Sequence, residues 1–182
     1  NSTKDVICVA VQPGYETKAS YSKTVTATDG ANSTTQNITG NVTNVNEAPT
    51  FASSAVFSAA ENQTSIGTVT AHDVEEDTRS YSISGSDITI NSSTGVIVFA
   101  SAPDYETKTS YSATVTATDG ANSTTQNITV NVTNVNEAPT FASSAVFSAA
   151  ENQTSIGTVT ANDVEEDTIS YSISGSDITI NS

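Results

Sequence analysis

The stretch that decides the fold is Tyr111–Phe141, YSATVTATDGANSTTQNITVNVTNVNEAPTF. Residues Tyr111–Ala117 alternate between apolar and hydroxyl side chains, which predicts a strand with one buried face. Asp119–Gly120 marks a hairpin loop, and Ile128–Val132 alternates again on a second strand. The sequence therefore predicts a β-hairpin that leads into a polar segment closed by proline.

That final segment, Asn131–Phe141, is repeated without change as Asn41–Phe51. We call Asn41–Phe51 the first joint and Asn131–Phe141 the second joint. The proline in each joint stiffens the exit of the chain and bars a helix. Each joint follows one strand pattern and precedes another, which predicts a boundary between stacked β-domains. Its oxygen-bearing side chains suit a bound cation.

The joints belong to an internal repeat of 90 residues, because Tyr15–Ile90 aligns with Tyr105–Ile180 and only five positions differ. If the joints mark the boundaries, the chain has three parts. Residues 1–47 are the back half of a repeat (the opening half), residues 48–137 a complete repeat (the central repeat), and residues 138–182 the front half of a repeat (the closing half).

Further alternating segments complete the central repeat. The expected strands lie near Thr50–Phe57, Ile66–Ala71, Arg79–Ser84, Ile88–Ile90 and Val96–Phe99. Together with the hairpin they make seven short strands, the spacing of a Greek-key sandwich. The predicted fold class is all-β, with tandem seven-stranded Greek-key sandwiches of the immunoglobulin-like type placed end to end.

Composition excludes several classes of function. The chain has 20 acidic against 5 basic residues and a net charge of −15, which disfavours nucleic acid as a partner. No segment approaches the roughly 18 apolar residues of a membrane span. The single histidine, His72, is replaced by Asn162 in the next copy, so no Ser-His-Asp arrangement is available and we expect no enzyme.

Cys8 is the only cysteine, so a disulfide framework within one chain is excluded. It takes the place of Val98 on a predicted strand and is expected to be a small buried hydrophobe. An interchain disulfide is the alternative.

Five motifs follow one another in a fixed order across the repeat. They are AAEN at Ala59–Asn62, AHDVEEDTRSYSISG at Ala71–Gly85, INSSTGVIVF at Ile90–Phe99, PDYE at Pro103–Glu106, and ATDG at Ala117–Gly120 running on to NVNEAPTF at Asn134–Phe141. In this order and spacing the sequence resembles a cadherin repeat, in the style of bacterial cadherin-like proteins. The resemblance covers nearly the whole chain and implies an extracellular or cell-surface location.

The resemblance also implies Ca²⁺ between successive domains. For the second joint the implied ligands are Glu61, Asp104, Glu106, Asn134, Asn136, Glu137, Asp163 and Glu165. For the first joint they are Glu16, Asn44, Asn46, Glu47, Asp73, Glu75 and Asp119, with Asp77 and Asp167 as further candidates. The chemistry agrees, because Ca²⁺ takes about six to eight oxygen ligands and gathered carboxylates repel one another without a cation.

The sequence departs from the family pattern in two places. The joint is one residue shorter than the usual linker, with Asn134 and Glu137 where the family has Asp. Gly14 stands where the next copy has Asp104, which leaves the first joint one ligand short. We therefore expect fewer or weaker ions at each joint than the family's three.

Half a sandwich leaves its inner apolar face exposed to solvent and its strand edges unpaired. Either the closing half of one copy pairs with the opening half of the next, which builds a head-to-tail filament, or the same pairing is continuous within a longer repetitive chain. In both cases Glu151 would complete the first joint of the neighbouring segment, and Asp29 of that segment would complete the second joint here.

One pair of substitutions predicts the register of the opening hairpin. Lys23 replaces Ala113 and Gly40 replaces Val130, both on inward faces. If the lysine stem fills the space of the missing side chain, Lys23 and Gly40 are direct cross-strand neighbours.

The predicted function is an extracellular, calcium-stiffened structural or adhesive repeat protein that forms a rod or a filament. The alternative is a carbohydrate-binding module, although tryptophan is absent. Ten Asn-x-Ser/Thr sequons also occur, which Asn- and Thr-rich strands generate by composition and which a suitable host would glycosylate.

Overall fold

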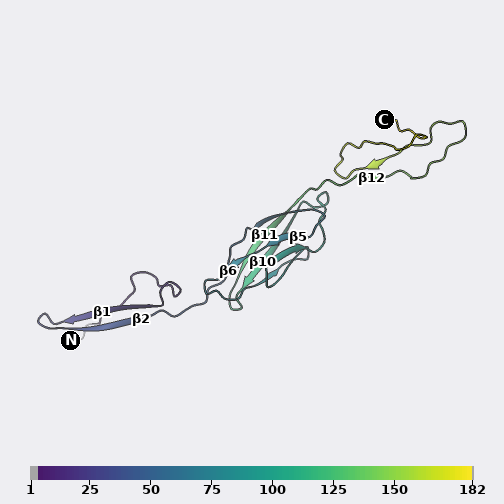
Figure 1. Ribbon diagram of the computed structural model, residues 1–182. Helices are drawn as coiled ribbons and strands as arrows, with labels where there is room; N and C mark the ends of the chain where they lie inside the picture. The colour runs from purple at the N-terminus through teal and green to yellow at the C-terminus, as the bar shows by residue number, and fades with distance from the viewer. Residues whose placement is uncertain (1–3, 182) are drawn as a thin grey trace.

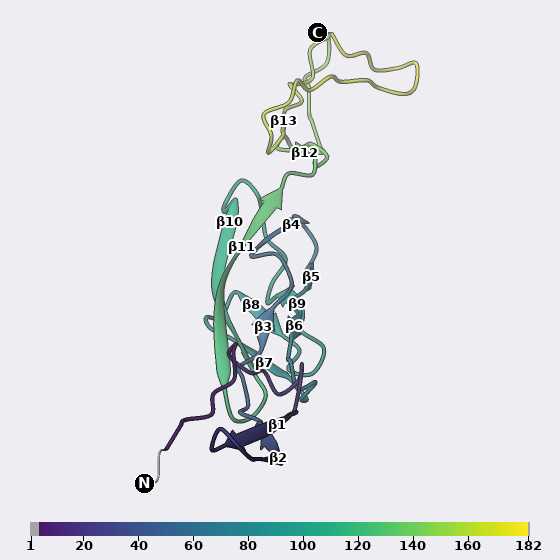
Figure 2. The ribbon, with the colours of Figure 1, turned by 90° about the vertical axis from the view of Figure 1, so that its left-hand side faces the viewer.

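A computed structural model describes residues 4–181 and contains thirteen β-strands, with no helix among those residues. The prediction of an all-β chain is confirmed. The opening and closing halves lie at opposite ends of the central repeat, so the chain has the form of a rod (Figures 1 and 2). The described part of the chain has no helix that is long and apolar enough to cross a membrane.

The central repeat is a sandwich of two main sheets. Its strands are β3 (Thr50–Phe51), β4 (Val56–Ala60), β5 (Ser65–Thr68), β6 (Ala71–His72), β7 (Ser80–Ile83), β8 (Ile88–Ile90), β9 (Val96–Phe99), β10 (Ser110–Thr118) and β11 (Ser123–Thr133). One sheet has the order β4-β11-β10-β7 and the other the order β5-β9-β8, while β3 and β6 form a short pair of their own. All these pairings are antiparallel except that of β4 with β11, which is parallel.

The β10–β11 hairpin behaves as its sequence predicts. Val115 and Ala117 are fully buried on β10, and Ile128, Val130 and Val132 are buried on the same face of the hairpin, further along β11. The loop consists of the two residues Gly120 and Ala121. Gly120 has φ +100°, and a positive φ at the first position of a tight hairpin turn is adopted most readily by glycine. The hydroxyl side chains of β10 alternate with these apolar side chains and lie on the opposite face of the strand.

The core lies between the two sheets. Its fully buried side chains include Phe99 and Ile97 of β9, which meet Val115 and Ile128 from the hairpin. Phe99 also packs edge to face on Tyr111, with ring centroids 5.0 Å apart. Each such buried side chain stabilises the fold by about 1.5–3 kcal/mol.

Two predicted strands are each divided in two. The segment expected at Thr50–Phe57 splits into β3 and β4, because the Ser54 hydroxyl accepts a hydrogen bond from the Val56 amide (3.0 Å) and closes a turn between the sheets. The segment expected at Ile66–Ala71 splits into β5 and β6. There the chain leaves β9 after Thr68 and pairs with β3 instead.

Within residues 4–47, the opening half forms one hairpin, made of β1 (Ser20–Thr28) and β2 (Ser33–Asn41). Cys8 is exposed and outside any strand, so the prediction that it is buried is wrong. Its counterpart in the central repeat is held on β9 by β5 and β8, and both of those strands belong to the front half of a repeat.

The predicted register of this hairpin is also wrong. Lys23 pairs with Ile38, and Gly40 pairs with Tyr21, so Lys23 and Gly40 are diagonal neighbours. The reason is the loop, which contains only Gly30 and Ala31 and shifts the pairing by two residues from the predicted one.

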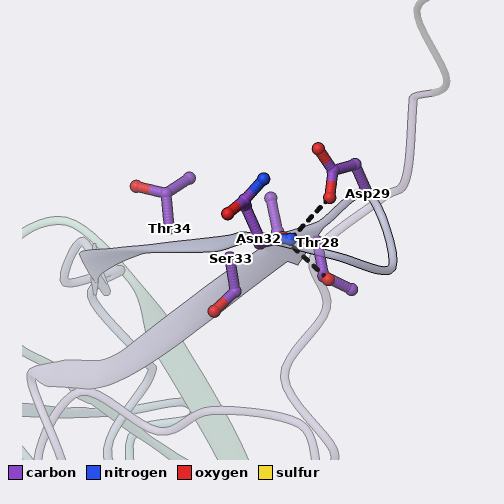
Figure 3. A pocket seen from close by; sticks show the side chains of 6 residues that line it. Thr28, Asp29, Asn32, Ser33 and Thr34 are labelled. Carbon is purple, nitrogen blue, oxygen red and sulfur yellow. Dashed lines mark hydrogen bonds between the residues drawn. The ribbon is translucent and has the colours of Figure 1, made fainter.

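Figure 3 shows the tip of this hairpin, where Asp29 Oδ1 accepts a hydrogen bond from the Asn32 amide (2.7 Å). The Thr28 hydroxyl donates to the Asn32 carbonyl (2.9 Å) from the other side of the turn. Side chains as well as backbone therefore fix the two-residue loop.

The closing half is mostly loop. Its strands are β12 (Thr140–Phe141) and β13 (Ala161–Asn162), which pair antiparallel as β3 and β6 do in the central repeat. Apolar residues that have buried counterparts in the central repeat are exposed here, Ile178 among them.

Candidate metal centres

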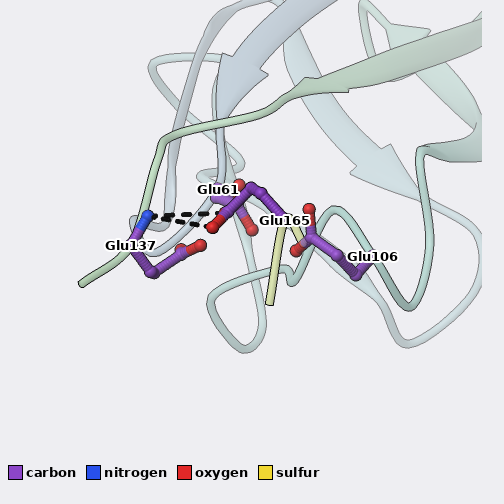
Figure 4. A group of neighbouring side chains, drawn as sticks. All are labelled: Glu61, Glu106, Glu137 and Glu165. Carbon is purple, nitrogen blue, oxygen red and sulfur yellow. Dashed lines mark hydrogen bonds between the residues drawn. The ribbon is translucent and has the colours of Figure 1, made fainter. Parts of the chain in front are cut away.

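The second joint gathers four glutamates from two successive repeats. Glu61 follows β4, Glu106 lies in the turn before β10, Glu137 lies in the joint itself, and Glu165 comes from the closing half. One carboxylate oxygen of each lies within 4.8 Å of the others, and Figure 4 shows the four side chains converging on one volume.

Backbone amides fix Glu61 at the centre of this group. Its side chain is only 3% exposed, and its two oxygens accept hydrogen bonds from the amides of Tyr105 and Val135, both at 2.7 Å. Neighbouring amide side chains orient two other members of the group. Asn134 donates to Glu106 (2.9 Å), and Asn62 donates to Glu137.

At the second joint, desolvation and mutual repulsion make it unfavourable for all four glutamates to be ionised at once. Desolvation raises the pKa of Glu106, and the nearby charges of Glu61, Glu165 and Asp104 raise it further. The pKa of Glu165 is also raised, chiefly by the hydrogen bond that its carboxyl shares with Glu137. A cation at this position would reverse these effects, because it favours the ionised form of every ligand.

The first joint repeats the arrangement with three glutamates. Oxygens of Glu16, Glu47 and Glu75 lie within 4.8 Å of one another. Both carboxylate oxygens of Glu75 are buried and have no hydrogen-bond donor among the described residues. The neighbouring carboxyl of Glu47, with which protonated Glu75 would share a hydrogen bond, is the largest cause that raises the pKa of Glu75, followed by desolvation.

Asp73 lies two residues before Glu75 in the chain. It is 1% exposed, and its Oδ1 accepts hydrogen bonds from the amides of Glu75 (3.1 Å) and Asp77 (3.2 Å). Its Oδ2 is buried without a donor in the described part of the chain. Buried acceptors of this kind are costly unless they are satisfied, and a cation satisfies them.

The hairpin tip of the central repeat reaches back to the first joint. Asp119 Oδ2 accepts a hydrogen bond from the Asn46 side chain (2.7 Å), and the Asn122 side chain donates to the Asn46 carbonyl (2.7 Å). The Asn122 amide and the Asn46 side chain together lower the pKa of Asp119, so this carboxylate stays ionised. The structure therefore brings Asp119 to the place that the sequence predicted.

Other predicted ligands lie outside the two glutamate groups. Asp104 accepts hydrogen bonds from the Thr107 amide (3.1 Å) and hydroxyl (2.9 Å), which lower its pKa. Asp163 accepts from the Asp167 amide (3.1 Å). Asn44 is exposed, and the Asn136 side chain donates to the Glu137 carbonyl (3.0 Å).

Asp29 and Glu151 lie in the two half-repeats, and the structure does not bring either of them to a joint of its own chain. Asp29 closes a hairpin turn, and Glu151 is exposed in a turn of the closing half.

Sequence reasoning missed two polar residues. Asn62 adjoins the predicted Glu61 and adopts φ +61°, a left-handed conformation that asparagine tolerates better than most residues. Asn122 completes the hairpin turn after Asp119. In both cases the available signal was the position of an asparagine beside a predicted acidic ligand.

Fold and site together define a class of protein, in which β-sandwich repeats are joined end to end and acidic side chains from both neighbours gather at each boundary. The central repeat belongs to the cadherin domain family, since the family model for the Cadherin domain matches residues 55–133. The resemblance predicted from the five motifs is confirmed.

A curated relative is the protocadherin-like wing polarity protein stan of Drosophila melanogaster, 34% identical over 162 residues. The match covers 77% of this chain and 4% of that protein, so the chain spans a small fraction of this relative's length.

Solved structures of proteins from this family are similar to the chain. Human protocadherin-24 EC1-2 is 26% identical with a TM-score of 0.50, over 65% of this chain and 61% of that one. Mouse cadherin-23 EC22-24 is 26% identical with a TM-score of 0.53, over 85% of this chain and 56% of that one.

Proposed function

We propose that this chain is an extracellular adhesive or structural repeat protein in which Ca²⁺ at each joint stiffens the rod. The observation that carries the proposal is the convergence of carboxylates from two successive repeats at both joints. Cadherin-domain homology supports the adhesive class and the extracellular setting.

The donor set supports Ca²⁺ as the ion. Carboxylate and amide oxygens with backbone carbonyls nearby are hard ligands, and neither thiol nor imidazole is present in either group. At the second joint Glu61 and Glu106 from the central repeat would share the ion with Glu165 from the closing half. A shared ion would bind the two repeats to each other and limit rotation at the joint.

The same proposal gives the acidic surface a role. With a net charge of −15 the chain repels itself, and the carboxylates at the joints repel one another most strongly because they are closest. Removal of Ca²⁺ would therefore loosen the joints before it affects the sandwich. We extend the proposal to a rod or head-to-tail filament, in which half-repeats of neighbouring segments pair.

Small-angle X-ray scattering and thermal melting in millimolar Ca²⁺ and in EDTA test the proposal. We expect a longer, stiffer particle and a higher melting temperature with Ca²⁺, because a ligand of the folded state stabilises it. Equal profiles in both conditions would contradict the role of Ca²⁺.

Glu165→Gln and Glu166→Gln form a matched pair for this test. Both remove one carboxylate from the same turn, but only Glu165 belongs to the glutamate group, and Glu166 is exposed. The Ca²⁺ effect should shrink in the Glu165 variant and persist in the Glu166 variant.

A further inference from the structure

We propose that Lys108 is a positioning residue for the second joint, because it ties the turn that carries Asp104 and Glu106 to the core of the central repeat. The inference rests on the proposed function for the role of the ion. The attachment of the turn itself is supported by contacts that involve no ion.

The turn lies between β9 and β10 and is closed by hydrogen bonds within itself. The Lys108 amide donates to the Asp104 carbonyl (2.9 Å). The amide and the hydroxyl of Thr107 donate to the Asp104 carboxylate (3.1 and 2.9 Å). These bonds fix the shape of the turn, but they do not fix its place on the sandwich.

The turn is also bonded to the segment that follows β4. The Tyr105 amide donates to Glu61 (2.7 Å), and the Pro103 carbonyl accepts a hydrogen bond from the Asn62 amide (3.0 Å). Glu106 extends from the same turn towards the other three glutamates of the second joint (Figure 4). Before an ion binds, repulsion among these carboxylates acts to move the turn away from the joint.

Lys108 connects the turn to the body of the sandwich. Its Nζ lies 2.9 Å from Oδ2 of Asp87, just before β8, and 4.0 Å from the ring centroid of Tyr111 on β10. The Tyr111 ring in turn packs edge to face on Phe99, which is buried in the core. An ion pair and a cation–π contact therefore hold the turn in place against the repulsion at the joint.

The lysine–tyrosine contact recurs in the other copy of this turn. Lys18 Nζ lies 4.6 Å from the ring centroid of Tyr21, and the Lys18 amide donates to the Gly14 carbonyl (2.9 Å). The contact forms there although Gly14 takes the place of Asp104. It is therefore a property of the turn itself and does not depend on the carboxylate that begins the turn.

The charge of Lys108 taken alone would act on Ca²⁺ in the opposite direction. A positive charge near the joint repels a cation, so its removal would strengthen Ca²⁺ binding if electrostatics were its only role. Loss of the attachment should weaken binding, because the turn must then be ordered when the ion binds. The sign of the change in affinity separates the two roles.

Isothermal titration calorimetry of the full chain with Ca²⁺ measures this sign. A Glu47→Gln/Glu75→Gln background disables the glutamate group of the first joint, so that the titration reports the second joint. In this background Lys108→Met removes both the ion pair and the cation–π contact. The partners of the ion pair are 48% and 55% exposed, so we expect a moderate loss of Ca²⁺ affinity, about threefold to tenfold.

Two variants control for charge. Lys108→Arg should retain the affinity, because a guanidinium group also pairs with carboxylates and stacks on aromatic rings. Lys23→Met removes the same charge from an exposed position of the opening hairpin and should leave the affinity unchanged. An affinity that is unchanged or higher in the Lys108→Met variant would overturn the proposal.

Amide hydrogen exchange in EDTA tests the attachment in the absence of an ion. Lys108→Met should speed exchange of the Tyr105 and Thr107 amides about threefold to tenfold, because the turn opens more often. The Phe99 amide, which donates to a backbone carbonyl in the sandwich, should exchange as before. Unchanged exchange in the turn would overturn the role of Lys108.

The two measurements separate this proposal from the proposed function. Ca²⁺ binding by the parent chain, with the same affinity and the same exchange in Lys108→Met, would overturn the role of Lys108 alone. Faster exchange in the turn, with no Ca²⁺ binding by any variant, would support the attachment by Lys108 and overturn the proposed role of the ion.

Discussion

The central repeat and the two half-repeats carry almost the same residues, yet they differ in what those residues bury. Val115 is fully buried in the central repeat, whereas Val25, in the same position of a strand motif that differs only by Lys23 in place of Ala113, is 42% exposed. Local sequence accounts for the hairpin and its turn in both places. The core forms only where front-half and back-half strands are both present, because the sheet pairings that enclose it join the two halves.

The largest expected effect comes from truncating the same residue in the two settings. Ile97→Ala should destabilise the central repeat by about 2–5 kcal/mol, since it leaves a cavity in a fully packed core. Ile7→Ala should leave the melting temperature of the dilute chain unchanged and weaken association at high concentration. Thermal melts at low concentration, with sedimentation velocity at high concentration, measure both.

Equal destabilisation by the two variants in dilute solution would contradict the comparison. It would mean that Ile7 is already buried within a single copy.

The next effect concerns the buried carboxylate at a joint. Glu61→Gln should cost about 1–3 kcal/mol in the central repeat, because one of its two backbone donors loses a good acceptor. It should also weaken Ca²⁺ binding, as measured by isothermal titration calorimetry. Glu151→Gln is the matched control, and in the dilute chain it should change neither quantity.

The differences in stability and in Ca²⁺ affinity between the Glu61 and Glu151 variants should shrink once copies associate. A Glu151 variant that loses Ca²⁺ affinity in dilute solution would place this residue at a joint of its own chain, contrary to the structure.

A third expectation concerns Gly40, which would leave a void where half-repeats of neighbouring segments pair as proposed. Gly40 has open space around its Cα, and its counterpart Val130 is fully buried. Gly40→Val should therefore strengthen association roughly tenfold, equivalent to about 1.4 kcal/mol, without destabilising the hairpin. Thr39→Val, on the outward face of the same strand, is the control, and sedimentation equilibrium gives both constants.

The smallest effect is a pH dependence that changes sign with Ca²⁺. The pKa of Glu75, Glu106 and Glu165 is raised in the folded chain, so the folded state binds these protons more tightly than the unfolded state. In EDTA, lowering the pH from 7 towards 5 should raise the melting temperature slightly. In Ca²⁺ the same change should lower it, since protons compete with the ion. A shift of the same sign in both conditions would contradict this expectation.

The sequence predicts much of this molecule because its repeats are nearly identical. Alternation placed Val115 and Ile128 in the core, and the five motifs identified the family. The glutamates chosen from the family pattern converge in space, although their role as ligands stays a prediction. The boundaries of the three parts of the chain also stay predictions.

What sequence reasoning missed depends on long-range pairing. Cys8 has a strand sequence, but the strands that would hold it in place are missing from its half. The register of Lys23 depends on whether the loop has two or four residues, which alternation alone does not determine. The division of the segment Thr50–Phe57 depends on which sheet each part joins.

The parallel pairing of β4 with β11 has a consequence for a chain under tension. β4 lies just after the chain enters the repeat, and β11 is the last strand before it leaves. A pull on the two ends of the rod would drag these parallel neighbours in opposite directions along their length. Their hydrogen bonds would then be loaded together in shear rather than opened one at a time, so the repeat should resist stretching far better than a hairpin pulled apart from its ends.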